Sequence, residues 1–303
     1  MSGILSELSE AFATLVEEAG KSVVRVNGRR GRASSGIVWS ENGTIIAANH
    51  CIEWEEAIEV GLPDGQSQQA ALIGRDPTTD LAVIQVAAGG QLPAQWLSPE
   101  TLRVGSLAVS LARPGRNLRA SMGMIRALGD AWYTRAGGRV DSFLETDLRP
   151  FPGYSGSLLV DVHGRALGIN TAGLRRGASL ALPAPTVRRV VEALAAHGRV
   201  RRGFLGVSTY PVRLPTALAG ELEQRSGLLV VSVQPKSPAA EAGLVLGDVL
   251  VAVDGHPLQT PMDLLSYLGE DRIGAEAILR ILRVGDLRDV PVRFGARDEA
   301  EAR

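Results

Sequence analysis

GRDPTTDLAV, residues 74–83, decides the fold, because it places an aspartate directly before a predicted strand. The strand continues as Leu81–Val86, an apolar run with β-branched residues and the length of a buried strand. His50 lies thirty residues before Asp80 and follows the apolar run Thr44–Ala48, which predicts another strand. His50 and Asp80 are therefore expected at strand ends in one β-rich region.

Ser155 completes this pattern, in the stretch PGYSG at residues 152–156. A serine hydroxyl is a weak nucleophile until a base removes its proton, and histidine is such a base when a carboxylate fixes its tautomer. Gly153 permits a tight turn in which the N–H groups of Gly153 and Ser155 converge as an oxyanion hole. Alone, each residue has an ordinary structural explanation, as a core histidine, a strand-start aspartate or a turn serine. The chain order His50, Asp80, Ser155 in a β-rich region favours a catalytic triad.

The surrounding sequence consists of short strand patterns from Lys21 to about Ala172, separated by Gly, Pro, Asn and Asp. Strands at this spacing predict an all-β barrel or sandwich pair. The helix Pro185–His197 follows, with Gly198 as its stop signal and the basic stretch Arg199–Arg202 as a linker. The predicted strands are Ser22–Val26, Gly36–Trp39, Thr44–Ala48, Ala70–Gly74, Leu81–Val86, Ser106–Leu111, Leu158–Val160 and Ala166–Asn170.

A second, smaller α+β unit is expected from Gly203 to about Gly295. The patterns in this part of the chain alternate between strands and short helices. We expect strands at Leu228–Val233, Asp248–Val253, Ala277–Val284 and Val290–Phe294, and helices at Pro238–Ala242 and Pro261–Leu268.

Composition excludes several classes of protein. The chain has 303 residues with a formal net charge of −1, which argues against nucleic-acid binding through bulk positive charge. One cysteine and four histidines argue against a disulfide framework and a His- or Cys-built metal site, so no metal is expected. We expect the single cysteine, Cys51, to be a small buried apolar residue.

Residues 1–20 predict an amphipathic helix, because apolar residues recur at three- and four-residue steps from Ile4 to Val16. The same residues contain four glutamates and no Lys or Arg, which is not the pattern of a secretory signal. No run has the length of a membrane span, so no integral membrane segment is expected. As written, the sequence predicts a cytoplasmic protein, or a periplasmic or extracellular one if a leader has been removed.

The chain resembles an HtrA/Deg-type serine protease with one PDZ domain, over roughly residues 20–295. The matching stretches are SGIV and NG at 35–38 and 42–43, AANH at 47–50, GRDPTTDLAV at 74–83, MGMI at 122–125, ETD at 145–147, PGYSG at 152–156, GINT at 168–171 and RGFLGV at 202–207. The resemblance implies a mainly β, two-barrel trypsin-like protease domain at 21–200 and a small α+β PDZ domain at 203–295. The helix 1–20 precedes them and a charged tail, 296–303, follows.

The resemblance also implies roles for single residues. His50 is the general base, Asp80 orients it, Ser155 is the nucleophile, and Gly153 and Ser155 form the oxyanion hole. The primary pocket is expected on the strand and loop that contain Ile169, Asn170, Thr171 and Leu174, whose apolar members favour cleavage after aliphatic residues. In the PDZ domain, a peptide's C-terminal carboxylate is expected at Phe204, Leu205, Gly206 and Val207.

The implied function is ATP-independent cleavage of unfolded or misfolded proteins as part of protein quality control, with no metal or organic cofactor. The implied partners are unfolded proteins, C-terminal peptides and further copies of the chain, as a homotrimer in which residues 1–20 take part.

Three departures from the family pattern leave an alternative open. Tyr154 and Ser157 stand beside the nucleophile where asparagine and glycine are usual, and Asp130 stands where the family often has an activating arginine. Either side chain beside Ser155 is expected to disfavour the oxyanion turn. The alternative is a latent or catalytically weak protease-like scaffold or chaperone that binds peptides through its PDZ domain.

Overall fold

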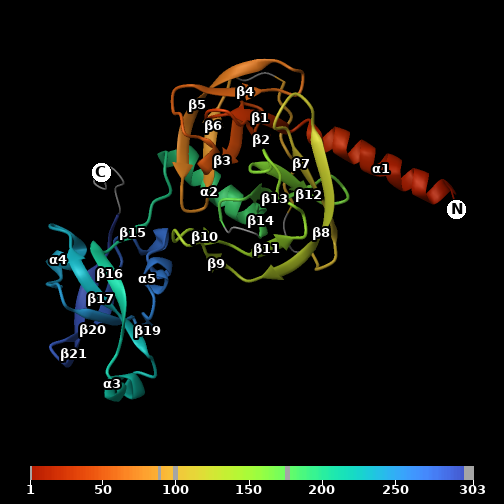
Figure 1. Cartoon of the computed structure of the whole chain (residues 1–303). Helices are drawn as coiled ribbons and strands as arrows, with labels where there is room; N and C mark the ends of the chain where they lie inside the picture. The colour runs from red at the N-terminus through yellow and green to blue at the C-terminus, as the bar shows by residue number, and fades with distance from the viewer. Residues whose placement is uncertain (1, 88–89, 98–101, 175–177, 297–303) are drawn as a thin grey trace. The chain divides into compact units, whose positions relative to one another are not determined.

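The computed structural model describes residues 2–87, 90–97, 102–174 and 178–296. The chain divides into two compact units, residues 1–200 and 201–303, each described separately below. The first unit contains two closed six-stranded barrels, and the second is a small α+β module (Figure 1). The predicted fold class is therefore confirmed. The expected charged tail lies, apart from Ala296, outside the described residues.

The first barrel has the strand order β1-β2-β3-β6-β5-β4, and all of its pairings are antiparallel. Its strands alternate with turns that use glycine at positive φ, such as Gly43 and Gly65. A one-turn 3₁₀ helix, η1 (Asn49–Cys51), follows β3. The strands are β1 (Val23–Asn27), β2 (Ser34–Val38), β3 (Thr44–Ala48), β4 (Ile58–Gly61), β5 (Ser67–Asp76) and β6 (Leu81–Gln85).

The second barrel has the strand order β11-β14-β13-β12-β7-β8. A short hairpin of β9 (Trp132–Tyr133) and β10 (Arg139–Val140) lies between β8 and β11 in the chain. The barrel strands are β7 (Leu107–Ala112), β8 (Arg119–Gly129), β11 (Phe143–Thr146), β12 (Ser157–Val160), β13 (Ala166–Thr171) and β14 (Ser179–Pro183).

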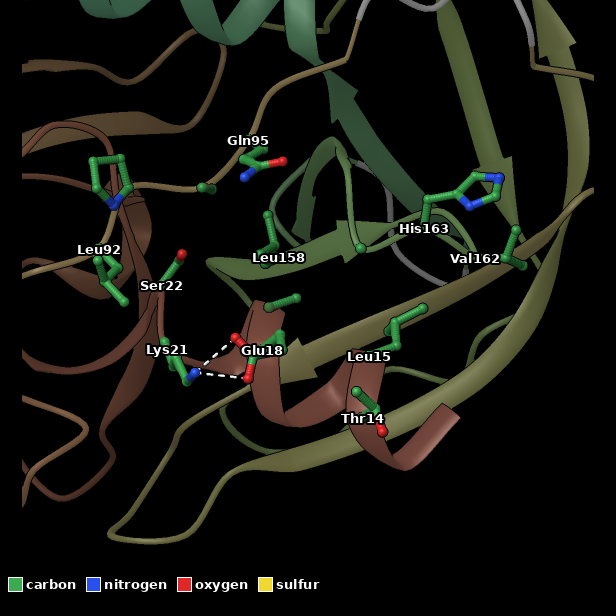
Figure 2. Close-up of a pocket in the computed structure, with 14 residues that line it drawn as sticks. Thr14, Leu15, Glu18, Lys21, Ser22, Leu92, Gln95, Leu158, Val162 and His163 are labelled. Carbon is green, nitrogen blue, oxygen red and sulfur yellow. Dashed lines mark hydrogen bonds and ion pairs between the residues drawn. The ribbon is translucent and has the colours of Figure 1, made fainter. Parts of the chain in front are cut away.

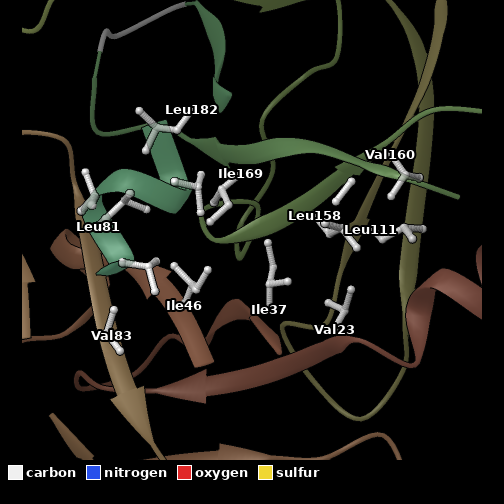
Figure 3. Close-up of a cluster of buried hydrophobic side chains, with 14 of the residues drawn as sticks. Val23, Ile37, Ile46, Leu81, Val83, Leu111, Leu158, Val160, Ile169 and Leu182 are labelled. Carbon is white, nitrogen blue, oxygen red and sulfur yellow. The ribbon is translucent and has the colours of Figure 1, made fainter. Parts of the chain in front are cut away.

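One apolar core joins the two barrels. Side chains from β2, β3 and β6 of the first barrel meet those from β7, β12 and β13 of the second, as Figure 3 shows for Ile37, Ile46 and Ile169 among others. Helix α2 (Ala184–His197) covers this core with Val187, Val190, Val191 and Leu194, which lie on one helical face. It ends at Gly198, the predicted stop signal, whose φ of 70° makes a left-handed cap.

Helix α1 (Ser2–Gly20) packs on the rest of the first unit only through its C-terminal half. Phe12, Leu15, Val16 and Ala19 contact the core, whereas the N-terminal part extends away from the barrels (Figure 1). The apolar residues of that part are exposed, with Ile4 at 73%, Leu5 at 72% and Leu8 at 50%.

The second unit is built on a sheet with the order β16-β17-β18-β20-β21 and a separate pair, β15 with β22. Helix α4 begins after Ser237, whose hydroxyl accepts a hydrogen bond from Ala240 N–H, and α5 begins at a capping box of Thr260 and Asp263. The strands are β15 (Gly203–Phe204), β16 (Val207–Arg213), β17 (Ser226–Val233), β18 (Val249–Val253), β19 (His256–Pro257), β20 (Glu276–Arg283), β21 (Asp286–Arg293) and β22 (Gly295–Ala296). The helices are α3 (Thr216–Glu221), α4 (Pro238–Glu241), α5 (Pro261–Tyr267) and the one-turn η3 (Glu270–Arg272).

Candidate active site

His50 and Asp80 are brought together by the pairing of β3 with β6. Ala48 lies opposite Leu81, so the residues that follow one strand and precede the other are neighbours. The buried Asp80 carboxylate accepts a hydrogen bond from His50 N–H at 2.9 Å and lies 2.7 Å from His50 Nδ1. Two bonds to one carboxylate fix the imidazole ring and place the proton on Nδ1, which leaves Nε2 as the basic nitrogen.

Thr171 and Gly173 complete the surroundings of this pair. The Thr171 hydroxyl donates a hydrogen bond to Asp80 Oδ2. Gly173 passes so close that an added Cβ would lie 2.4 Å from Asp80 Oδ2 and 3.0 Å from His50 Nδ1. A side chain at residue 173 would therefore displace the His50–Asp80 pair. Neither role was predicted, because the sequence does not show how closely the chain after β13 approaches the carboxylate.

The pKa of His50 is strongly perturbed. The hydrogen bond with Asp80 makes the largest contribution to raising it to about 10, Cys51 adds to the rise, and burial of the ring opposes it. A raised pKa means that the site stabilises an imidazolium. This is the species that forms when a histidine accepts the proton of a serine nucleophile.

Ser155 lies in the loop between β11 and β12, within what we call the oxyanion loop, residues 151–156. Its hydroxyl accepts a hydrogen bond from Ala172 N–H at 3.2 Å, and Ala172 directly precedes the glycine that packs on His50. The hydroxyl therefore lies at the same end of the barrels as His50 and Asp80. Among the described residues, no hydrogen bond joins the Ser155 hydroxyl to the His50 ring.

The turn around Gly153 has the features that an oxyanion hole requires. Gly153 has a φ of 88°, and a Cβ added there would lie 2.2 Å from Pro114 Cβ, so both conformation and space exclude other residues. Within the described part of the chain, neither Gly153 N–H nor Ser155 N–H donates to a protein acceptor. Both are free to bind an oxyanion.

The two unusual residues beside Ser155 point away from this turn. The Tyr154 side chain is buried, and its hydroxyl lies 2.7 Å from Ser179 Oγ, which also accepts a hydrogen bond from Thr146. Ser157 is buried, and its hydroxyl accepts a hydrogen bond from Asn170 Nδ2 at 3.0 Å. The sequence suggested that Tyr154 and Ser157 crowd the turn around Gly153. Their hydroxyls instead pair with residues of the second barrel.

The expected substrate-pocket residues are divided by the structure. Ile169, Asn170 and Thr171 are buried in the free chain, and their assignment to the primary pocket stays a prediction. They are buried because β13 is a central strand of the second barrel, between β12 and β14. Leu174 does line a cavity, of about 500 Å³, together with His50 and Asp80. Arg135 of the loop after β9 lines the same cavity and was not predicted.

Cys51 is buried and forms no disulfide, in agreement with the sequence interpretation. It ends η1, directly after His50, and the next residue, Ile52, is buried in the core of the first barrel.

The second unit contains a groove of about 660 Å³ between β16 and α5. The segment 203–209 lines one side, and Leu264, Leu265 and Leu268 line the other. β16 is an edge strand of its sheet and can accept an additional strand. The loop before it turns at Gly206, whose φ is 86°.

The four predicted carboxylate-loop residues differ in their placement. All four line the groove, but the Leu205 side chain is buried in the core of the unit. Among the described residues, no protein acceptor is bonded to the N–H groups of Leu205 and Gly206. The loop at residues 204–207 therefore presents the backbone N–H groups of Leu205 and Gly206 to a ligand.

Another cavity, of about 410 Å³, lies beside the C-terminal half of α1 (Figure 2). Leu15 and the ion-paired Glu18 and Lys21 line it from α1 and the residue after the helix, and Leu92 and Val162 line it from other segments of the first unit. The sequence did not predict this cavity, and it contains none of the predicted site residues.

Comparison with known proteins identifies both units. A family model described as a trypsin-like peptidase domain matches residues 34–169, and one described as a PDZ domain matches residues 203–293. A probable periplasmic serine endoprotease DegP-like of Chlamydia trachomatis is 33% identical over 264 residues, covering 85% of this chain and 53% of the relative. The protein of the same name from Brucella suis is 33% identical, covering 90% of this chain and 56% of the relative.

A probable periplasmic serine protease do/HhoA-like of Haemophilus influenzae is 30% identical, covering 90% of this chain and 60% of the relative. This chain thus spans little more than half the length of the curated relatives it matches. Among solved structures, the HtrA-type protease AlgW with decapeptide superposes with a TM-score of 0.74 at 26% identity, covering 95% of this chain and 99% of that one. The serine endoprotease from Yersinia pestis superposes with a TM-score of 0.74 at 28% identity, covering 95% and 98%.

These relatives correct the expected location. The sequence predicted a cytoplasmic protein because residues 1–20 contain no basic, apolar leader, but the curated relatives are named as periplasmic proteins. In the described part of the chain, no helix has the length and apolar character needed to span a membrane.

The comparisons support the family resemblance seen in the sequence. Two family models match the two units, the curated relatives match most of the chain, and the solved structures have nearly the same length. The chain belongs to the HtrA-type serine proteases with one PDZ domain.

Proposed function

We propose that this chain is an ATP-independent serine endopeptidase with Ser155 as nucleophile, His50 as general base and Asp80 as its orienting carboxylate. The observation that carries the proposal is the pairing of His50 Nδ1 with Asp80 at 2.7 Å, next to a serine loop with two unpaired N–H groups. A serine, a histidine and a carboxylate that orients the histidine perform acyl transfer on several unrelated folds.

In the proposed reaction, His50 Nε2 takes the Ser155 proton while Oγ attacks the carbonyl carbon of the scissile bond. Gly153 N–H and Ser155 N–H stabilise the oxyanion. The C–N bond breaks as His50 gives its proton to the leaving amine, and water then hydrolyses the acyl-enzyme by the same steps. Because the Ser155 hydroxyl is bonded to Ala172 N–H in the free chain, we propose that it turns to His50 when substrate binds.

Casein hydrolysis tests this assignment. Ser155→Ala is expected to abolish cleavage, whereas Ser67→Ala, which changes an exposed serine of the first barrel, is expected to cleave as the wild type does. Equal activity of wild type and Ser155→Ala would assign the nucleophile elsewhere. Absence of cleavage by all three would contradict the proposed activity.

We propose unfolded chains as substrates, cut after aliphatic residues. The apolar Leu174 beside His50 supports this preference, and Asp80, which is committed to His50 and Thr171, is the only carboxylate lining that cavity within the described residues. Sequencing the fragments of a denatured protein checks it, because cuts mainly after Lys or Arg would contradict an apolar pocket.

We propose that the second unit binds the free C-terminus of a peptide. The unpaired N–H groups of Leu205 and Gly206, the edge strand β16 and the apolar side of α5 support this mode of binding. A peptide with a free carboxylate should bind the full chain at least tenfold more tightly than its C-terminal amide. Leu265→Glu should remove that binding, and equal affinities for acid and amide would contradict the proposal.

We also propose that copies of this chain associate, as a trimer by family resemblance, through the exposed N-terminal part of α1. Its exposed Ile4, Leu5 and Leu8 support a protein partner, and a second copy is the partner that the family implies. Sedimentation velocity should show a trimer for the wild type and a monomer for Leu5→Glu, while Glu7→Gln on the same helix stays trimeric. A monomeric wild type would contradict the association.

The names of the curated relatives support a periplasmic site of action.

A further inference from the structure

Within the described part of the chain, the hydrogen bonds from the first barrel to the oxyanion loop come from Ser35 of β2. Its hydroxyl donates a hydrogen bond to Gly153 O at 2.9 Å, and its N–H donates to Ser155 O at 3.2 Å. Ser35 is fully buried, so water does not compete for either bond. These carbonyls belong to the two residues whose N–H groups are proposed to bind the oxyanion.

Ser35 is in turn held by Arg113, which follows β7. Arg113 N–H donates to Ser35 Oγ at 2.9 Å. The Ser35 hydroxyl therefore donates one hydrogen bond, to Gly153 O, and accepts one, from Arg113 N–H. The Arg113 guanidinium is mostly buried and donates to Gly20 O at 3.2 Å and to Val23 O at 2.7 Å. Among the described residues, Arg113 forms no ion pair, and its bonds go to backbone carbonyls.

One of those carbonyls ends α1. The last carbonyls of a helix have no partner within the helix and carry partial negative charge, so a cation is a favourable partner there. Gly20 is also packed tightly, since a Cβ added to it would lie 2.3 Å from Leu118 Cδ2. A continuous line of hydrogen bonds therefore runs from the end of α1 through Arg113 and Ser35 to the oxyanion loop.

We propose that Ser35 and Arg113 are positioning residues that hold the oxyanion loop in its productive conformation and tie it to the end of α1. The inference rests on the proposed peptidase function. Glycine at residue 153 has no side chain to anchor it, and its positive φ is one of several conformations open to glycine. Fixing the Gly153 carbonyl removes the freedom to rotate the peptide that connects the two donors of the hole.

The consequence is specific to the transition state. An oxyanion hole stabilises charge that is absent from the bound substrate, so a loosened hole lowers kcat and leaves KM nearly unchanged. A loss of folded enzyme also lowers the apparent kcat at constant KM, but it leaves the affinity of the remaining folded enzyme for a transition-state analogue unchanged. The affinity for a transition-state analogue should fall together with kcat.

Ser35→Ala and Ser34→Ala form a matched pair for this test. Both remove a buried hydroxyl from β2, but the Ser34 hydroxyl donates to Val26 O within the first barrel and, among the described residues, has no hydrogen bond to the oxyanion loop. With a chromogenic peptide, Ser35→Ala should lower kcat at least tenfold with KM within twofold, and should weaken binding of a valine boronic acid peptide equally. Ser34→Ala should keep kcat within twofold of the wild type.

Arg113 is tested by Arg113→Met and Arg113→Lys. Arg113→Met removes the donors to Gly20 and Val23 but keeps the N–H that bonds to Ser35, so kcat should fall about fivefold, with partial recovery in Arg113→Lys. Because the two residues act in one line, the double variant of Ser35→Ala and Arg113→Met should be no slower than Ser35→Ala alone. If Ser35→Ala fails to unfold cooperatively, Ser35→Cys is used in its place. Cysteine keeps a donor of similar size, so its kcat should lie between those of the wild type and Ser35→Ala.

The outcomes separate the inference from the function on which it rests. If the wild type does not cleave the peptide, the proposed function fails. If the wild type cleaves and Ser35→Ala matches Ser34→Ala in kcat and boronate affinity, the positioning role fails alone. Effects of Ser35→Ala and Arg113→Met that multiply in the double variant would overturn the connection to α1.

Discussion

The Asp80 carboxylate binds His50 twice, through the backbone N–H at 2.9 Å and through Nδ1 at 2.7 Å. One bond fixes where the residue lies and the other fixes how its ring is oriented. The same carboxylate receives the Thr171 hydroxyl, so its acceptor sites are occupied by groups that hold it in place. The chemistry proposed for Ser155 depends on this orientation.

Activity should rise with pH through the titration of His50. The proposed base is the neutral ring, and the bond to Asp80 raises the pKa of His50 to about 10, so the neutral form increases as pH rises above neutrality. We expect kcat/KM to climb between pH 6.5 and 10 in buffers of constant ionic strength. An acid limb centred below pH 6 would contradict the account.

Asp80→Asn should change the same profile in two ways. Without the carboxylate, the pKa of His50 should fall toward the ordinary value of 6.5, so the acid limb should move to lower pH. The plateau should fall about 10⁴-fold, because an amide favours the wrong tautomer. Asp76→Asn, four residues earlier at the end of β5, is the control, because the Asp76 carboxylate accepts hydrogen bonds from Thr78 and Thr79 and none from His50 among the described residues. If Asp80→Asn lowers the maximum of kcat/KM but leaves the acid limb at the wild-type pH, Asp80 is not the group that raises the pKa of His50.

Folding stability should fall as pH rises, whereas activity should increase. A pKa that is higher in the folded chain than in the unfolded chain stabilises the fold fully below pH 6.5, and this contribution is lost as pH rises through about 10. The midpoint of urea unfolding should therefore decrease over this range more in the wild type than in His50→Gln. Parallel curves for the two proteins would show that His50 does not carry the linkage.

Gly153→Ala should impair catalysis about 100-fold or more, which is the cost of one lost oxyanion donor. Its positive φ disfavours alanine, and Pro114 occupies the space that a Cβ needs. Gly65→Ala is a matched control, because Gly65 has a φ of 89° but nothing within 4 Å of an added Cβ. Peptide hydrolysis by Gly65→Ala should stay near that of the wild type. Similar losses in both variants would mean that strain alone, and not the oxyanion loop, lowers the rate.

Tyr154→Phe should lower stability by about 1–2 kcal/mol, because it removes a buried hydroxyl that pairs with Ser179. Ser179 keeps its bond from Thr146, so the remaining hydroxyl is not left alone. Tyr210→Phe, at an exposed site of the second unit, should change the unfolding free energy by less than about 0.5 kcal/mol. Urea denaturation compares the two, and equal stability of both variants would leave Tyr154 without an anchoring role.

The sequence predicted elements wherever a local signal was strong. The apolar run of β3 gives its bounds, Thr44–Ala48, without error, and α2 begins one residue before the predicted start because Pro185 is favoured in a first turn. β8 was missed, although it spans Arg119–Gly129, because most of its residues are exposed or half-buried and glycine and methionine interrupt its alternation. β14 was missed because Ser179 and Pro183 bound a run that is fully buried and therefore does not alternate.

The candidate site divides in the same way. His50, Asp80, Gly153 and Ser155 were predicted because each stands in a short motif whose chemistry is visible along the chain. Ser35 and Arg113 were not predicted, since their importance comes from contacts with residues 118 and 93 positions away. The burial of Asn170 was missed for the same reason, because its partners Ser110 and Ser157 come from two other strands.

The most direct test of the central claim is intact-mass analysis of the chain after reaction with a fluorophosphonate, with the modified residue located by peptide sequencing. The account predicts one adduct, on Ser155, in the wild type, and none in Ser155→Ala. The rate of labelling should fall at least 100-fold in His50→Ala, because the base is then absent. An unmodified wild type, or an adduct on another serine, would contradict the claim that His50 activates Ser155.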